Sequence, residues 1–393
     1  MDQFSRTIES AIASNDYTSL ARVFGHGPQS FQSMGQGEQR SLAAFFLKTA
    51  VNSKTFLPAA FSSAQAMGAF EVALSQLPAT VENAADSKLR QMMFDYKVNK
   101  EEDYSGAARI LGGMRMETTP ESVYYLSQAE MCDVYVKIAE CFLEEDETVE
   151  ADAAVTKAGG VVENITDPEQ HMTLILRFKS TYARVLDSNR KFSSAASRYH
   201  DLSQSTTDLI EADDLLQMLG RAATCAILSS GPQRQRVLGL VYKDPRMSQL
   251  ESIPAFEGHA TILKKMYTNQ VLKKEELVKF EASLADHQKA IMGDGMTILE
   301  RAVLEHNMLA VSKLYNSIYF SELGRILGVD AFKAEKIAAN MIMNQVFGGT
   351  IDQVEGLLNF ASDETEQQKW DKSIISFCSE LNMIAEEIKA ESQ

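Results

Sequence analysis

The chain has 393 residues, of which 45% are hydrophobic and 23% charged, which is enough apolar material for a sizeable folded core. Lys and Arg total 38 against 54 Asp and Glu, and the net charge of −16 argues against a general binder of nucleic acids or anionic membranes. Four scattered cysteines argue against a disulfide framework, and no apolar run reaches the roughly 18 residues of a membrane span. We therefore expect a soluble intracellular protein.

The negative charge is concentrated in one stretch of the chain. Residues 101–150 contain 13 acidic and 3 basic side chains, so −10 of the total −16 lies there. Such a stretch predicts either a solvated helix surface or an acidic face that meets a basic partner. We favour the solvated surface, because charge runs usually lie on the water-facing side of helices.

Amphipathic helices are predicted over the first two thirds of the chain. Apolar residues recur there at spacings of three and four, and alternating strand patterns are almost absent before residue 315. Three segments also resemble one another, each with an aromatic residue three or four positions before small residues: residues 15–23, 102–110 and 190–198. Small residues let helices approach closely while the ring fills the gap to the next unit. The pattern predicts a right-handed solenoid of tetratricopeptide-like repeats.

The pattern changes after about residue 297. The predicted order becomes helix, strand, helix, helix, strand, strand, which is that of a winged helix. The elements are a helix over 297–315, a strand over 317–320, a helix from a Ser321 cap to Gly328, a helix from an Asp330 cap to Gly348-Gly349, and hairpin strands over 350–352 and 356–360.

Winged helices often bind DNA, but the charge of this one argues against that role. Residues 257–345 carry 11 basic and 11 acidic side chains, whereas a helix and wing that grip phosphates show a basic excess. We therefore predict a packing and docking module, whose candidate docking residues are Ile318, Phe320, Ile351 and Gln353.

A final helix follows a polar linker over 361–369. Its apolar residues alternate spacings of four and three, a period of 3.5 typical of helices that pack along one seam. We call these residues the terminal seam: Trp370, Ile374, Phe377, Leu381, Ile384 and Ile388. From the pattern alone the seam either folds back on its own domain or joins a bundle with helices of other chains.

No motif of an active site stands out in the sequence. There is no G-x-x-x-x-G-K-[ST] loop, no G-x-S-x-G elbow and no H-E-x-x-H helix. The six histidines never occur as H-x-H or within one helical turn of each other, and no cysteine pair has C-x-x-C spacing. We predict no catalytic residue, no metal site and no cofactor, and we interpret His306 as a polar packing residue.

The succession of helical repeats, winged helix and terminal helix resembles the plan of PCI-domain proteins. These are scaffold subunits of the proteasome lid, the COP-9 signalosome and translation initiation factor three. Several segments resemble the fourth-subunit branch of the signalosome: residues 182–187, 242–244, 287–290, 305–307, 312–316, 333–338, 351–353 and 370–372. The resemblance is dense over about residues 100–390 and loose before them.

The resemblance implies a non-catalytic scaffold and regulatory subunit of the complex that deneddylates cullin-RING ubiquitin ligases, with the metalloprotease site on another subunit. The implied partners are the other PCI subunits, the metalloprotease-fold pair and the cullin-RING ligases that the subunit helps to sense. No nucleic acid or membrane is implied, and the implied location is cytoplasm and nucleus. Two alternatives stay open: a paralogous PCI subunit of the proteasome lid, and a nucleic-acid-binding winged-helix protein.

The same reading predicts four parts along a mostly α-helical chain. They are a helical-repeat solenoid over 1–200, the helical part of a PCI domain over 201–296, its winged helix over 297–360, and a linker with the bundle helix over 361–393.

Overall fold

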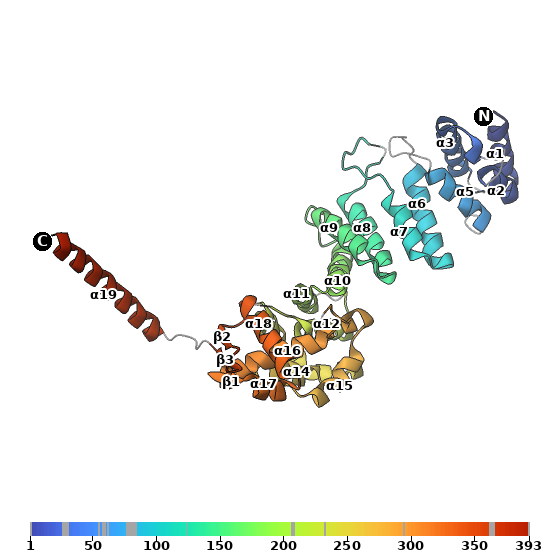
Figure 1. The fold of residues 1–393 in the computed structure, drawn as a ribbon. Helices are drawn as coiled ribbons and strands as arrows, with labels where there is room; N and C mark the ends of the chain where they lie inside the picture. Colours follow the sequence, from blue (N-terminus) through green and yellow to red (C-terminus); the bar gives the residue numbers. More distant parts are fainter. Residues whose placement is uncertain are drawn as a thin grey trace. The chain divides into compact units, whose positions relative to one another are not determined.

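The computed structural model describes residues 2–25, 31–53, 56, 60, 63–75, 85–122, 124–205, 209–231, 233–293, 295–360 and 366–391. The chain divides into two units, Met1–Met218 and Leu219–Gln393, which are described separately (Figure 1). The predicted part boundaries at residues 200, 296 and 360 stay a prediction.

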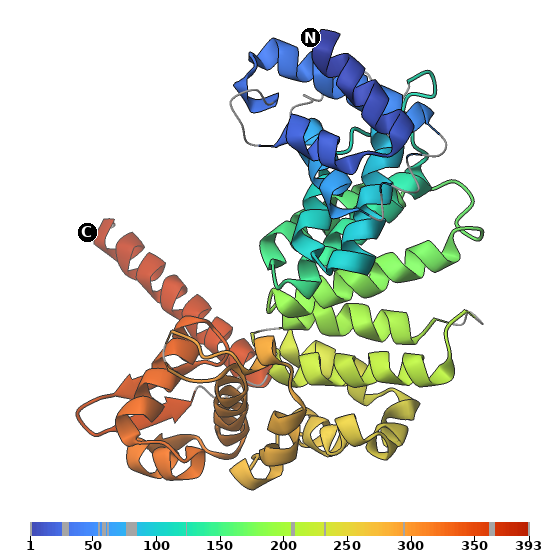
Figure 2. The same cartoon turned by 90° about the vertical axis from the view of Figure 1, so that its right-hand side faces the viewer.

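The first unit consists of helices that pack mainly against their neighbours along the chain, so that α8 to α11 lie side by side (Figure 2). Its elements are α1 (Asp2–Ser14), α2 (Tyr17–Phe24), η1 (Phe31–Ser33), α3 (Gln36–Asn52), α5 (Ala64–Ser75), α6 (Ala85–Tyr96), the π-helical η2 (Lys97–Glu101), α7 (Tyr104–Gly112), α8 (Gln128–Glu144), α9 (Thr148–Val162), α10 (Met172–Ser188) and α11 (Phe192–Ser203). Helix α12 (Ala212–Leu228) crosses the boundary between the units.

The repeated segments of the sequence all begin a helix in the same way. Asn15, Glu102 and Arg190 adopt positive φ angles of 54°, 55° and 60°, and each lies two residues before the first residue of a helix. Asp146, with φ 57°, makes the same turn before α9. The starts of α7, α9 and α11 are therefore 44 residues apart. The sequence pattern missed the copy at α9 because a threonine takes the place of the aromatic residue.

The second unit begins with short helices and ends in a winged helix and the terminal helix. Its elements after α12 are α13 (Arg234–Tyr242), η3 (Pro245–Ser252), η4 (Pro254–Phe256), α14 (His259–Tyr267), α15 (Lys274–Ser283), η5 (Asp286–Lys289), α16 (Ile298–Leu314), β1 (Ser317–Tyr319), α17 (Phe320–Leu327), α18 (Ala331–Met343), β2 (Gly349–Asp352), β3 (Leu357–Phe360) and α19 (Glu366–Glu391).

The winged helix has the predicted order of elements. Its antiparallel sheet has the strand order β1-β3-β2, with Ile318 opposite Leu358 and Ile351 opposite the same residue on the other side. Asp330 caps α18 as predicted, because its carboxylate accepts a hydrogen bond from the backbone N–H of Lys333 at 2.6 Å. The mostly helical fold with repeats and a winged helix is thus confirmed.

Two predicted boundaries in the winged helix are wrong. Ser321 does not cap α17, because β1 runs directly into the helix: the backbone N–H of Phe320 donates to the Gly356 carbonyl at 2.8 Å, and Phe320 is the first helical residue. Helix α18 ends at Met343, before Gly348-Gly349. There Gln345 adopts φ 56°, and the N–H of Val346 returns to the Met341 carbonyl at 2.9 Å, a turn that closes the helix.

Candidate interaction surfaces

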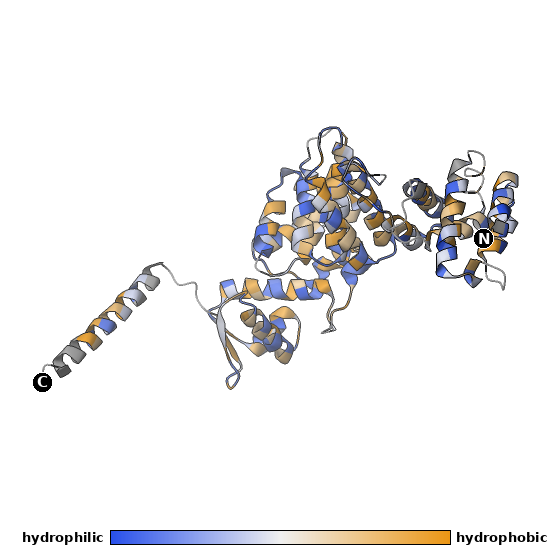
Figure 3. Ribbon diagram, turned by 90° about the horizontal axis from the view of Figure 1, so that it is seen from above, coloured by the Kyte–Doolittle hydropathy of each residue, from blue (hydrophilic) through white to orange (hydrophobic). Residues whose placement is uncertain are grey.

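The terminal seam lies on α19, along which hydrophobic and hydrophilic residues alternate in the ribbon of Figure 3. The exposed fraction is 70% for Trp370, 42% for Ile374, 62% for Phe377, 49% for Leu381 and 51% for Ile384. Ile388 belongs to the same helix, and its side chain lies outside the described part of the structure. A contiguous exposed apolar face of this kind commonly marks an interaction site, so the face is a candidate interaction surface.

The four candidate docking residues of the winged helix are placed differently from one another. Ile318 and Phe320 are each only 5% exposed and belong to the winged-helix core, so their side chains stabilise this domain and are not available to a partner. Ile351 is half-buried against the same core. Gln353 is exposed, and its amide donates to Glu335 Oε1 at 2.7 Å. Docking through this face stays a prediction, carried by Ile351 and Gln353 alone.

Residues 305–307, part of the family resemblance, hold α16 to the loop between α14 and α15. His306 Nε2 lies 2.8 Å from the Gln270 carbonyl oxygen and donates to it. Asn307 accepts from the Leu272 N–H at 2.8 Å and donates to the Leu272 carbonyl at 3.0 Å. Both side chains are nearly fully buried. The segment therefore joins the winged helix to the helices before it, which agrees with His306 as a polar packing residue.

The same region contains a buried charge. Arg234 is buried, and its Nε and Nη1 atoms have no hydrogen-bond partner within the described residues, while Nη2 lies 3.7 Å from Met266 Sδ. Burial lowers the pKa of Arg234 to about 10, against the attraction of Glu305. Burial and, to a smaller extent, the nearby Arg234 charge together lower the pKa of His306 to about 4, against the opposing effect of its hydrogen bond to Gln270. His306 is therefore neutral at physiological pH, which fits its role as a donor to a carbonyl.

Two arginines of α10 neutralise part of the acidic stretch of residues 101–150. Arg177 on α10 forms a fork with the Glu140 carboxylate and lies 3.1 Å from Asp133 Oδ1, both acids being on α8. Arg184 lies two helical turns further along α10, and its guanidinium donates to the Glu144 carboxylate at 2.9 Å. These ion pairs join α8 to α10. Part of the negative charge of the stretch therefore stabilises the packing of these helices.

A second ion-pair group was not apparent from the sequence. Lys97 in η2 is 8% exposed, and its ammonium lies 2.7 Å from Glu71, 3.2 Å from Glu101 and 2.9 Å from Asp103. These carboxylates hold the pKa of Lys97 above its usual value, against the opposing effect of burial. The lysine thereby ties α5 to the start of α7, at the point where one apolar core, which ends at Met93, gives way to the next, which begins at Phe94.

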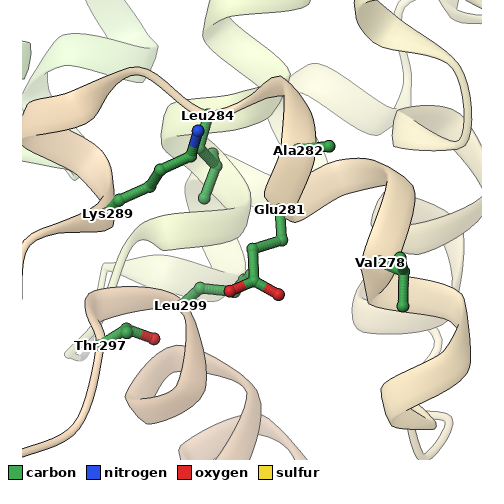
Figure 4. A pocket seen from close by; sticks show the side chains of 7 residues that line it. All are labelled: Val278, Glu281, Ala282, Leu284, Lys289, Thr297 and Leu299. Carbon is green, nitrogen blue, oxygen red and sulfur yellow. The ribbon is translucent and has the colours of Figure 1, made fainter.

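A pocket of about 390 Å³ lies between α15 and the start of α16 (Figure 4). The Glu281 carboxylate points towards Thr297 and Leu299, and Lys289 is the other charged lining residue.

No group of three or more His, Cys, Asp or Glu side chains in the described part of the chain could hold a metal ion. Among the described helices, none is long and apolar enough to cross a membrane.

Comparison with known proteins defines the class. Residues 261–362 match the PCI domain family, and residues 79–213 match the family described as PSMD12/CSN4, N-terminal. The PCI match spans α14 to β3 and so contains the 305–307 segment and the winged helix. The chain is a PCI-domain protein.

Curated relatives narrow the class to one family. The COP9 signalosome complex subunit 4 of Arabidopsis thaliana is 41% identical over 290 residues, which cover 72% of this chain and 70% of the relative. The subunit 4 proteins of Dictyostelium discoideum and Drosophila melanogaster are both 39% identical over 290 residues; the alignments cover 74% of this chain and 70% and 67% of the relatives. The chain belongs to the COP9 signalosome complex subunit 4 family.

Proposed function

We propose that this protein is a non-catalytic scaffold subunit of a COP9 signalosome and that the complex removes the ubiquitin-like modifier from cullin-RING ligases. The observation that carries the proposal is the terminal seam, whose five described side chains are exposed and would gain stabilising burial against a helix of another subunit. Fully burying one large apolar side chain contributes about 1.5–3 kcal/mol. A subunit built to remain in an assembly is the simplest reason to keep such a face in solvent.

The proposal extends to partners and place in the cell. The other PCI subunits and the metalloprotease-fold pair would bind this chain within the complex, and the N-terminal helices would help to sense a bound cullin-RING ligase. The protein would act in cytoplasm and nucleus. A helical-repeat arm and a winged helix on one chain support this proposal, because each offers a protein-binding surface.

The first test is the native size of the tagged protein in a cell lysate, with mass spectrometry of the co-eluting proteins. A large assembly that contains a metalloprotease-fold subunit and cullins would support the proposal. Proteasome base and core subunits in its place would assign the chain to the proteasome lid. A species near its own 43.5 kDa would contradict a scaffold role.

The absence of catalysis has its own test. The purified chain alone should not cleave the modifier from a modified cullin, whereas the complete complex should. Chelator-sensitive cleavage by the isolated chain would overturn the proposal of a non-catalytic subunit.

A further inference from the structure

We infer that α19 selects a partner helix with lysine or arginine beside its apolar seam, and that a second copy of this chain is a poor partner. The inference rests on the proposed function, because it specifies the kind of helix that covers the terminal seam. It follows from the residues that border the seam on either side.

The two borders of the seam carry no basic residue. In the seven-residue register of the seam, one border is formed by positions 366, 373, 380 and 387, which are Glu, Ser, Glu and Glu. The other border is formed by positions 371, 378 and 385, which are Asp, Cys and Ala. The three lysines of the helix, at 369, 372 and 389, take other positions of the register. Asp371 and Glu380 are the acidic border residues whose side chains the structure describes, and both are exposed.

Border residues of this kind decide which helices pair. In a parallel pair of helices, the first border of one helix faces the second border of its partner, and in an antiparallel pair like borders face each other. Two copies of α19 would therefore place Glu366 against Asp371, or glutamate against glutamate, and would form no attractive charge pair. A partner with basic borders would form attractive pairs in either direction, each worth about 0.2–0.5 kcal/mol on a solvent-exposed helix surface.

The charges thus act mainly on partner choice. The apolar seam supplies the burial for any helix with a matching stripe, and the acidic borders penalise acidic helices, including a second copy. Four attractive pairs against none correspond to about a tenfold difference in the dissociation constant.

The experiment uses the full-length chain and two synthetic helical peptides. The peptides share one leucine and isoleucine seam and differ only at the border positions, which are all lysine in one and all glutamate in the other. Fluorescence anisotropy should show about tenfold tighter binding of the lysine peptide at about 50 mM salt, and a smaller difference at about 500 mM salt. Light scattering on the chain alone should report a monomer.

A pair of matched variants separates the borders from the overall charge. Ser373→Lys with Glu380→Lys changes two border positions and should abolish or reverse the preference for the lysine peptide. Ser379→Lys with Glu386→Lys changes the same residue types at the same spacing on the outer side of the register and should keep the preference. Equal binding of both peptides, binding of neither, equal effects of the two variants, or a stable dimer of the chain would overturn the inference.

The result is independent of the test of the proposed function. A chain that enters a signalosome-sized complex but binds both peptides equally loses this inference and keeps the proposed function. A chain that prefers the lysine peptide but never enters such a complex keeps the inference and loses the proposed function.

Discussion

Helices α18 and α19 carry apolar stripes of similar spacing and use them in opposite ways. On α18, Ala334, Ile337, Ala338 and Met341 are all at most 8% exposed, because they pack into the winged-helix core. On α19, the five described seam residues are between 42% and 70% exposed. An amphipathic pattern therefore predicts that a helix forms and which face it buries, but not whether the burying surface belongs to the same chain.

The largest expected effect comes from the same substitution in both helices. Ile337→Asp places a carboxylate in the winged-helix core, and we expect it to lower the free energy of unfolding by more than about 4 kcal/mol. Ile374→Asp on α19 should change it by less than about 0.5 kcal/mol, because that side chain already faces water. Urea unfolding of both variants measures the difference. Similar losses in the two variants would contradict the comparison.

The second largest effect is a pH dependence of the free energy of unfolding that comes from the buried His306. The pKa of His306 is about 4 in the folded protein, whereas an unperturbed histidine in the unfolded chain has a pKa of 6.5, so below about pH 6.5 the unfolded chain binds more protons than the folded one. Stability therefore falls as the pH is lowered. Between pH 7.5 and pH 5 the free energy of unfolding should fall by about 2 kcal/mol more in the wild type than in His306→Gln.

His306→Gln is a suitable reference because glutamine keeps an N–H donor for the Gln270 carbonyl and does not titrate. His259, whose pKa burial also lowers to about 4, remains in both proteins and cancels in the difference. If the two proteins show an equal pH dependence, the pKa of His306 is the same in the folded and unfolded states, and the prediction is wrong.

The third effect concerns the ion-pair group of the first unit. Lys97→Met keeps the buried stem of the side chain and removes the ammonium from three carboxylates. Because these carboxylates are 35–43% exposed and regain water, the expected loss is only about 1 kcal/mol. Lys100→Met, an exposed lysine of the same π-helical turn, is the control and should cost less than about 0.5 kcal/mol. Hydrogen exchange in α5 and α7 should rise only in the first variant.

The smallest effect is expected at the wing. Gln353→Ala removes one exposed hydrogen bond to Glu335 and should change the free energy of unfolding by less than about 0.5 kcal/mol. Any clear loss of assembly in this variant, with stability unchanged, would support docking through the wing. Unchanged assembly would leave Ile351 as the remaining candidate on that face.

Local signals in the sequence predicted much of this fold. The order of elements from α16 to β3 and the Asp330 cap follow from residues within one or two helical turns of each other. The Ser321 cap was wrong because a long-range hydrogen bond between Phe320 and Gly356 sets the start of α17. The turn before Thr148 was missed because its backbone geometry, and not its residue types, repeats.

The polar contacts could not be predicted for the same reason. Asn307 meets Leu272 across 35 residues, and Arg177 meets Glu140 across 37. Sequence spacing says nothing about partners at that separation. The terminal seam could be predicted from the sequence because all its residues lie on one helix. Its exposure could not be predicted, because exposure depends on which surfaces the rest of the chain covers.

The most direct test of the central claim is a double substitution in the terminal seam. Ile374→Asp with Leu381→Asp should leave the unfolding curve unchanged and release the tagged protein from its large complex, so that it elutes near 43.5 kDa. Ser376→Asp with Ser379→Asp places the same two residues on the outer face of α19 and should leave the complex intact. Co-purification of the seam variant with its partners at wild-type stoichiometry would contradict the claim that this helix is the assembly surface.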